Sequence, residues 1–416
     1  MRIFSIILFT FLFTNKYSAQ INGDSLFYVY SKKLSKSLDK KNRLDSLVYI
    51  SSKGIGIVDT NKRQKLIVQW QDLDKWKIAL KTISYDTIGT YIKDSVRLSA
   101  IINSTPLINV NQNLSKNTLE GVKIAIDPGH FAGNSRTAAI EEKYLTLPPY
   151  SDTLIEGELT LLTAQLIKEK LERFGANVLL TRTKPDQTAF GITFDEWYNK
   201  KRKTDVTNAF ANKEITAEEK DLLLGTTSKK IAFRKFFLNY ELKERARKIN
   251  AFKPDLTLII HYNVDEKNLN WRTPSEKNYN MFFVPGSFMP EELDNIETKL
   301  NLIRLLITDD LDKSVAFSGS IAQKMEQKTK IPLAKDTDAE YLSKYCLESN
   351  TAGVFHRNLT LTRLIQGTVC YGETMYQDNA TEFKLLIESK NRTPESRVKQ
   401  IANAYVDGIL EYLQVK

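Results

Sequence analysis

Val-Lys-Ile-Ala-Ile-Asp-Pro-Gly-His, at residues 122–130, combines the pattern of a buried strand with that of a tight turn. Apolar residues alternate with Lys123 and Ala125, which is typical of a β-strand, and Pro128-Gly129 ends that strand. Predicted strands and helices then alternate along the chain, and such alternation builds a parallel sheet covered by helices. We therefore predict an α/β fold: a mostly parallel sheet with helices on both faces.

The segments downstream follow helix and strand periodicity in turn. They are a helix over 158–174, a strand over 177–181, a helix over 231–252, a strand over 256–260, a last strand over 367–371 and a closing helix over 396–413. The strand over 256–260 is apolar on both faces and therefore belongs in the middle of the sheet. Glu241 and Arg245, on the long helix, have the spacing of an ion pair.

Three further regions complete the predicted organisation. Residues 20–118 carry no motif and are predicted to form a small α+β region. Its predicted parts are a polar helix over 25–51, strand-like runs over 65–69 and 96–100, and a linker over 115–118. A domain over 119–416 follows, with insertions between elements of its sheet near 184–230 and near 265–331. The first insertion is polar and irregular, whereas the second contains an aromatic patch and a helical segment over 291–311.

Residues 1–19 have the pattern of a secretory signal peptide. A basic start is followed by an apolar stretch too short to span a bilayer and by a small-residue site that ends at Ala19. An uncleaved membrane anchor is the alternative. We expect an exported protein, periplasmic or extracellular, with no transmembrane segment in the mature chain.

The formal net charge of +10 points to an acidic partner. In an exported protein this charge favours anionic cell-wall polymers or membrane surfaces. Nucleic acid is not expected, because the sequence has no compact basic stripe interleaved with aromatics and no zinc-finger cysteine pairs. Cys346 and Cys370 are the only cysteines, and they allow one disulfide but not a disulfide framework.

Two of the three histidines are candidates for a metal site. His130 and His261 each follow a predicted buried strand, and the carboxyl ends of strands line the ligand crevice of an open α/β sheet. A hydrolytic zinc site needs about three N or O ligands and an open position for water. Because His356 follows no comparable strand, we expect a carboxylate as third ligand, either Glu156 or Glu158. Taken singly, each histidine is more often a hydrogen-bonded structural residue than a ligand.

Several stretches resemble the zinc-dependent N-acetylmuramoyl-L-alanine amidases, the amidase 3 family. Residues 122–130 are similar to the family's opening strand motif, and Gly175 with Leu-Thr-Arg at 180–182 is similar to the end of its next helix and strand. Counting back from Gly175, the family's glutamate falls on Glu156. Ile-Ile-His-Tyr-Asn at 259–263 resembles the strand end that supplies the family's second histidine ligand.

The carboxyl-terminal part continues the resemblance. Gly-Glu-Thr at 372–374, with Asn379, is similar to the segment of the family's catalytic glutamate, and residues 401–413 match its closing helix. Phe-Ala at 131–132 stands where the family usually has Gly-Gly, and Met-Tyr at 375–376 replaces Gly-Phe. These departures bear on substrate fit more than on metal binding.

The resemblance implies a zinc hydrolase that acts on peptidoglycan. It implies that His130, Glu156 and His261 hold Zn²⁺ and that Glu373 is the catalytic acid and base. The implied reaction is hydrolysis of the amide bond between N-acetylmuramic acid and L-alanine. The alternatives are a secreted zinc peptidase acting on stem peptides and a non-catalytic cell-wall binding protein of the same fold.

Other residues carry narrower predictions. Arg182 and Arg363 meet either substrate carboxylates or structural partners, and Asp127 is either a turn former or a carboxylate that orients an imidazole. Some members of the resembled family are restrained by a helix inserted between the second histidine and the glutamate. We therefore hypothesise that residues 291–311 lie across the groove and that an activator protein or the wall displaces them. A solvated extension that only widens the groove is the alternative.

Overall fold

The computed structural model describes residues 23–62, 65–91, 97, 100, 118–225, 227–269, 271–389 and 396–415. The predicted signal peptide lies outside the described residues, as do most of the predicted linker and most of the strand-like run at 96–100. Within the described part of the chain, no helix has both the length and the hydropathy needed to cross a lipid bilayer.

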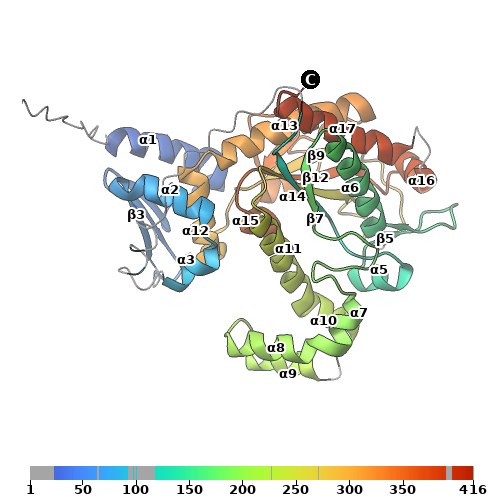
Figure 1. Ribbon diagram of the computed structural model, residues 1–416, viewed down its shortest axis with the longest axis horizontal. Coiled ribbons are helices and arrows are strands. Elements are labelled where there is room, and N and C mark those ends of the chain that lie inside the picture. Colours follow the sequence, from blue (N-terminus) through green and yellow to red (C-terminus); the bar gives the residue numbers. More distant parts are fainter. Residues whose placement is uncertain are drawn as a thin grey trace, which may run out of the picture.

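A seven-stranded sheet forms the centre of the molecule (Figure 1). Its strands, in spatial order, are β10 (Leu347–Glu348), β11 (Val354–His356), β9 (Met281–Val284), β12 (Val369–Tyr376), β8 (Leu256–Asn263), β4 (Lys123–Pro128) and β7 (Asn177–Leu180). β12, β8, β4 and β7 run parallel to one another, β9 is antiparallel to β12, and β10 is antiparallel to β11. The predicted mostly parallel sheet is therefore confirmed, and the strand that is apolar on both faces, β8, lies inside it.

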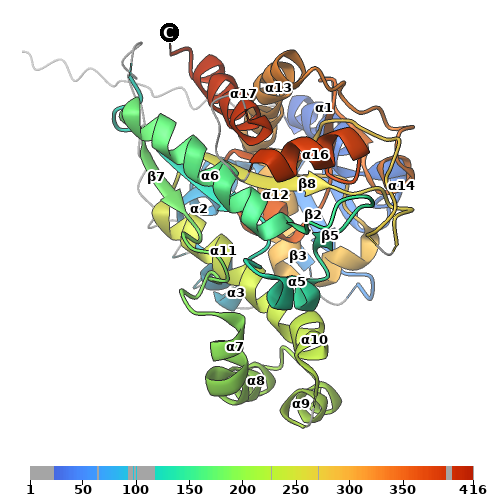
Figure 2. The same ribbon diagram turned by 90° about the vertical axis from the view of Figure 1, so that its right-hand side faces the viewer.

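Helices cover both faces of the sheet (Figures 1 and 2). On one face pack α6 (Glu156–Arg173), α13 (Asp310–Thr329) and α17 (Arg397–Tyr412), and on the other pack α11 (Leu238–Phe252) and α15 (Thr360–Leu364). Alternate side chains of β4 point to the two layers. Ile124 belongs to the same apolar cluster as Leu159 of α6, and Ala125 belongs to the cluster of Ile249 of α11. The predicted helices on both faces are confirmed.

Shorter elements join these layers. They are α5 (Ser135–Glu141) and the antiparallel pair β5 (Tyr144–Leu145) and β6 (Leu154–Ile155) between β4 and α6, together with α14 (Glu340–Tyr345) and α16 (Ala380–Glu388). Asn134 caps α5, because its side-chain oxygen accepts the backbone N–H groups of Arg136 and Thr137.

Residues 184–230 form a helical lobe next to α11 (Figure 1). Its helices are α7 (Phe194–Glu196), a π-helix (Trp197–Lys201), α8 (Arg202–Ala211), α9 (Ala217–Leu224) and α10 (Lys229–Ala232), and a second π-helix (Phe233–Phe237) leads into α11. α7 and α9 each begin with a capping box, formed by Thr193 with Glu196 and by Thr216 with Glu219. An aromatic core holds the lobe on α11, with the rings of Phe194 and Phe237 5.0 Å apart. The prediction of an irregular segment was wrong, because this core joins aromatic residues that are far apart in the sequence.

Residues 265–331 contribute to the main framework. They contain β9, which is a strand of the central sheet, then a 3-10 helix (Pro290–Asp294), α12 (Ile296–Ile307) and the whole of α13. Every residue from Thr298 to Ile307 is buried, because α12 packs between α15 and the helices of the amino-terminal region. The hydrophobic residues that suggested an exposed groove helix are therefore core residues.

The amino-terminal region is α+β, as predicted. It consists of α1 (Gly23–Lys33), a π-helix (Leu34–Leu38), a 3-10 helix (Lys40–Asn42), the antiparallel strands β1 (Val48–Ser51), β2 (Gly54–Val58) and β3 (Lys65–Gln69), a 3-10 helix (Trp70–Asp72), α2 (Leu73–Thr82) and α3 (Tyr85–Tyr91). The predicted strand-like run at 65–69 is β3. The helix predicted to reach residue 51 ends earlier, because β1 occupies residues 48–51. Ile57 and Leu80 share one apolar cluster with Leu302 of α12.

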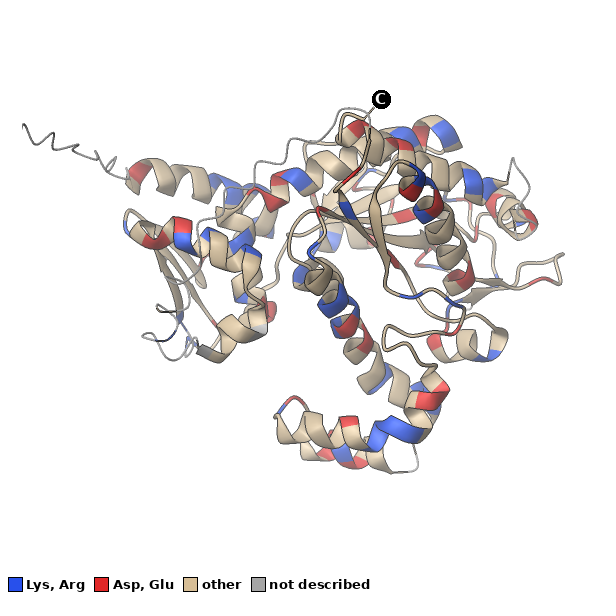
Figure 3. Cartoon of the chain, in the orientation of Figure 1, with Lys and Arg blue, Asp and Glu red and all other residues tan. Residues whose placement is uncertain are grey.

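Charges of both signs are interspersed along the outer helices (Figure 3). Arg136 and Lys229, for example, both pair with Asp195 at the base of the lobe, at 2.7 and 2.6 Å. Basic side chains at the base of the lobe are therefore paired with a carboxylate.

Candidate metal centre

Four residues from separate parts of the chain line one cavity at the carboxyl ends of β4, β8 and β12. His130 follows β4, Glu156 begins α6, His261 lies in β8 and Glu373 lies in β12. His261 and Glu373 are direct partners in the register of two parallel strands, so their side chains leave the sheet on the same side. The cavity has a volume of about 390 Å³. The fold thus brings together the four residues selected from the sequence.

The carboxylate of Glu156 faces both imidazoles. Its Oε1 lies 3.1 Å from Nδ1 of His261 and 3.4 Å from Nε2 of His130. One ligand atom from each of the three side chains lies within 4.8 Å of the other two. The two rings meet edge to face, with their centroids 4.9 Å apart. Two imidazole nitrogens and one carboxylate oxygen form a donor set that suits a catalytic zinc ion.

The electrostatics of this cluster call for a positive charge. Burial raises the pKa of Glu156, but the charges and hydrogen bonds of the two imidazoles outweigh it and hold that pKa well below its usual range. Burial lowers the pKa of His130, but the charges of Glu156 and Glu141 and their hydrogen bonds raise it to about 9. For His261 burial prevails, and its pKa falls. A proton on His130 therefore balances Glu156, and a bound cation would take over that role.

The turn after β4 is shaped by the second histidine. A Cβ on Gly129 would stand 2.3 Å from Nε2 of His261, so only glycine fits beneath that ring. His130 itself has a φ of 55°, in the left-handed region that few non-glycine residues adopt. The ring of Tyr371 stacks on the His261 ring, with centroids 4.8 Å and planes 3° apart. The His261 ring is therefore tightly confined.

Two buried arginines hold this turn in place. Arg245 donates to the carbonyl oxygen of His130 at 3.1 Å. Arg182 donates to the carbonyl oxygen of Gly129 at 3.1 Å and to that of Gly157, at the start of α6, at 2.6 Å. Of the two roles considered for Arg182, the structural one is supported, since it is 2% exposed and bonds the main chain.

Three buried carboxylates lie close to this turn. Asp127 and Glu241 pair with Arg245 at 3.2 and 2.8 Å, which confirms the predicted pair of Glu241 and Arg245. Asp127 faces this arginine rather than a histidine, so it does not orient an imidazole. That position belongs to Glu141, whose Oε1 lies 3.4 Å from Nδ1 of His130. No motif marked Glu141, because the turn and α5 bring it to the ring.

Glu373 is half-buried beside the cluster. Burial, followed by the negative charge of Glu156, raises the pKa of its carboxyl to about 7. A carboxylate with a pKa near neutrality suits proton transfer at neutral pH. β12 therefore presents a proton acceptor next to the three clustered side chains.

The loop after β8 supplies part of the cavity wall. Leu269 and Trp271 line the cavity from this loop, together with Lys143 from the connection between α5 and β5. The ammonium of Lys143 lies 4.6 Å from the centroid of the Trp271 ring. In the described part of the chain, no carboxylate forms an ion pair with Lys143. The cavity therefore contains a cation that is available to an acidic ligand.

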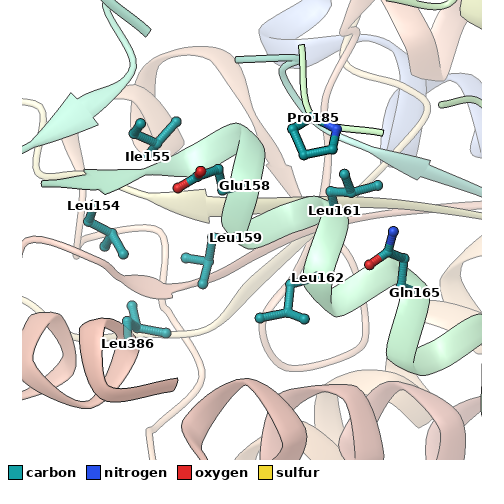
Figure 4. A pocket seen from close by; sticks show the side chains of 9 residues that line it. All are labelled: Leu154, Ile155, Glu158, Leu159, Leu161, Leu162, Gln165, Pro185 and Leu386. Carbon is teal, nitrogen blue, oxygen red and sulfur yellow. The ribbon is translucent and has the colours of Figure 1, made fainter. Parts of the chain in front are cut away.

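Glu158, the alternative third ligand, lines a different cavity (Figure 4). That cavity, of about 380 Å³, is mainly apolar, and its lining residues are Leu154, Ile155, Glu158, Leu159, Leu161, Leu162, Gln165, Pro185 and Leu386. Residues two positions apart on a helix are separated by about 200° around its axis, so Glu156 and Glu158 point in different directions. It is Glu156 that lies with the histidines.

The gating hypothesis was wrong. The cavity is lined by no residue of 291–311, a segment that the structure describes completely. α12 lies instead in the core between α15 and the amino-terminal region, where nothing could displace it without exposing apolar side chains. Arg363 does not line the cavity either.

The third histidine and the two cysteines lie elsewhere. His356 ends β11, so the prediction that it follows no comparable strand was wrong. It is buried, and its Nδ1 lies 3.2 Å from the carbonyl oxygen of Pro285. Cys346 and Cys370 are both buried and free, so they form no disulfide.

Comparisons with known proteins place these observations in a family context. A family model described as N-acetylmuramoyl-L-alanine amidase matches residues 124–411, which include His130, Glu156, His261 and Glu373. None of the curated proteins matches the chain.

Several solved structures are similar to the chain. The CwlD amidase from Clostridioides difficile, in complex with the GerS lipoprotein, has 18% identity and a TM-score of 0.40, covering 71% of this chain and 100% of that chain. The N-acetylmuramyl-L-alanine amidase Ami1 from Mycobacterium smegmatis has 14% identity and a TM-score of 0.40, covering 71% and 99%. The catalytic domain of CwlV, an N-acetylmuramoyl-L-alanine amidase from Bacillus (Paenibacillus) polymyxa var. colistinus, has 17% identity and a TM-score of 0.38, covering 71% and 99%.

Proposed function

The chain belongs to the N-acetylmuramoyl-L-alanine amidase family, and on that premise we propose that it hydrolyses the amide bond between N-acetylmuramic acid and L-alanine in peptidoglycan, as a zinc enzyme. The observation that carries this proposal is the cluster of His130, Glu156 and His261 beside Glu373 in one cavity. A hydrolase with a Ser, Thr or Cys nucleophile is not favoured, because the described residues that line this cavity include none of these three.

In this proposal His130, Glu156 and His261 hold the zinc ion. Glu156 supports the assignment because it is a buried carboxylate whose charge requires a cation, and both imidazoles face it. When bound, zinc would act as a Lewis acid on the scissile carbonyl and would make water acidic enough to lose a proton near neutral pH.

Glu373 is the proposed acid and base. Its carboxylate accepts a proton from the attacking water, whose oxygen forms a bond to the carbonyl carbon of the lactyl group. The same carboxyl then donates that proton to the nitrogen of L-alanine as the carbon–nitrogen bond breaks. A pKa near 7 supports both transfers, because the group gains and loses a proton readily at neutral pH.

Lys143 is the proposed contact for the acidic stem peptide. The peptide carries free carboxylates, and Lys143 is a cation of the cavity without an ion-pair partner among the described residues. Contact with the Trp271 ring keeps its ammonium in the cavity. This residue replaces Arg182, which is committed to main-chain carbonyls.

Product analysis tests the proposed function. The purified protein, loaded with about one zinc ion per chain, is incubated with soluble muropeptides, and the products are identified by mass spectrometry. We expect stem peptides with free L-alanine amino ends. Cuts inside the peptide would identify a peptidase instead, and zinc binding without any product would identify a non-catalytic wall-binding protein.

Action on peptidoglycan requires export. We infer that residues 1–19 are a signal peptide cleaved after Ala19, on the basis of their sequence pattern. Mass spectrometry of the protein recovered outside the cytoplasm should show Gln20 at the amino terminus. An exported protein that retains Met1 would show instead that the segment is an anchor.

A further inference from the structure

Glu141 is a buried carboxylate that the proposed mechanism leaves unused. It is the last residue of α5, and its side chain is 3% exposed. Its carboxylate accepts the backbone N–H groups of Phe131, at 3.2 Å, and Ala132, at 2.7 Å. In the described part of the chain, no Lys or Arg lies within ion-pair distance of it. Such a group is costly to bury unless several donors surround it.

The third neighbour of Glu141 is the His130 ring. Nδ1 of His130 lies 3.4 Å from Oε1 of Glu141, and Nε2 lies 3.4 Å from Oε1 of Glu156. The two ring nitrogens thus face two different carboxylates. A neutral imidazole has one N–H group and one lone pair. With the N–H group directed to Glu141, the lone pair of Nε2 points to the place where Glu156 and His261 converge.

We propose that Glu141 is a positioning residue that orients His130 for metal binding, an inference that rests on the proposed function. It holds the imidazole from behind, through Nδ1, and it holds the next two residues of the turn through their backbone N–H groups. Carboxylates behind metal-binding histidines fix ring orientation and raise ligand basicity. The role is specific, because Asp127, the other buried carboxylate of the turn, is engaged by Arg245.

The surroundings of α5 explain how Glu141 reaches the ring. Asp186 accepts the backbone N–H of Gly133 at 2.8 Å, which fixes the start of the turn that leads into α5. The turn also packs closely on α6, since a Cβ on Gly157 would lie 2.4 Å from the carbonyl oxygen of Ala132. The turn that carries His130 is thereby locked to the helix that carries Glu156.

The test compares two isosteric variants. Glu141→Gln removes the charge behind His130, while Glu241→Gln removes a buried charge that supports the same turn through Arg245 without touching the ring. Zinc affinity is measured by competition with a chelator, and folding is checked by the melting temperature. We expect Glu141→Gln to lower zinc affinity roughly 10- to 100-fold and Glu241→Gln to lower it much less, because the amide oxygen of Gln still accepts from Arg245. Equal losses in both variants, or no loss in Glu141→Gln, would overturn the positioning role.

A spectroscopic measurement separates positioning from a general loss of stability. In the zinc-loaded protein, the Nδ1–H proton of His130 should move upfield in Glu141→Gln, because its hydrogen bond weakens, and stay in place in Glu241→Gln. Should Glu141→Gln fail to fold, Glu141→Asp keeps the charge and is expected to retain zinc with reduced affinity. A wild-type protein that binds no zinc would overturn both this inference and the proposed metal site. Normal zinc binding with an unmoved proton overturns the positioning role alone.

Discussion

Two histidine-bearing ends of the same sheet have opposite character. At the ends of β4 and β8, His130 and His261 face the buried carboxylate of Glu156, which raises the pKa of His130 to about 9, although burial lowers the pKa of His261. At the end of β11, His356 bonds the carbonyl oxygen of Pro285, and burial lowers its pKa to about 4. A strand end therefore does not make a histidine a ligand. The buried carboxylate facing the ring makes the difference, because it requires a cation while a carbonyl requires only an N–H group.

The largest expected effect comes from substituting a histidine of the Glu156 cluster, compared with a substitution of His356. His261→Ala removes one of the three clustered donors, so the zinc content measured by elemental analysis should fall far below one ion per chain, and amidase activity should be lost with it. His356→Asn should retain zinc and activity, because Asn can still donate to Pro285. If His261→Ala kept its full zinc content, or if His356→Asn lost it, the comparison of the two ends would be wrong.

Glu373→Gln should separate zinc binding from catalysis in the cavity that contains His130 and His261. The variant keeps the shape of the side chain and the three clustered donors, so zinc content should be unchanged. Loss of the proton acceptor should lower kcat roughly 10²- to 10⁴-fold. Muropeptide hydrolysis followed by mass spectrometry measures this, and a variant with near wild-type kcat would remove Glu373 from the mechanism.

Lysines near the two ends provide a smaller, matched comparison. Lys143 at the cavity has no carboxylate partner among the described residues, whereas Lys33, whose charge acts on His356, is paired with Asp312 at 2.8 Å. Lys143→Gln should raise KM about tenfold with little change in kcat, since a hydrogen bond to a charged group contributes about 1.5 kcal/mol. Lys33→Gln should change neither constant. Steady-state kinetics with a stem peptide whose carboxylates are amidated adds a control, because amidation should abolish the difference between wild type and Lys143→Gln.

His356→Asn should have the smallest effect on activity. It should, however, change the pH dependence of stability measurably. Its folded pKa lies below the unfolded value of about 6.5, so the unfolded chain takes up the proton first as the pH falls. The stability contribution is complete above pH 6.5 and is lost between about pH 6.5 and pH 4, up to about 3 kcal/mol. His356→Asn should lose less stability over this range than the wild type in urea unfolding. Identical pH dependence in the two proteins would mean that His356 is not buried in its neutral form.

Much of the fold was readable from local patterns. The alternation in residues 122–130 and the apolar run of β8 reflect burial on the faces of a sheet, and burial is the strongest constraint on residue type. The helical lobe could not be predicted in this way, because its aromatic core joins Phe194 and Phe237, which belong to different helices. The prediction for α12 was wrong for a similar reason. Its apolar residues suggested a helix across the groove, but they pack against the distant amino-terminal region.

By itself, the sequence predicted the strand ends that carry His130 and His261, the motif that contains Glu373, and the parallel strands with their covering helices, because these depend on periodicity and on motifs within short stretches. Only the tertiary structure decided that Glu156 rather than Glu158 joins the histidines, that Arg182 holds the turn, and that Glu141 stands behind His130. The physical reason is that these assignments depend on the direction of side chains and on distances between segments. Spacing along the chain favoured Glu156 only through the family resemblance, and no spacing pointed to Glu141. Which buried carboxylate meets which ring is settled when the turn, α5 and α6 pack together.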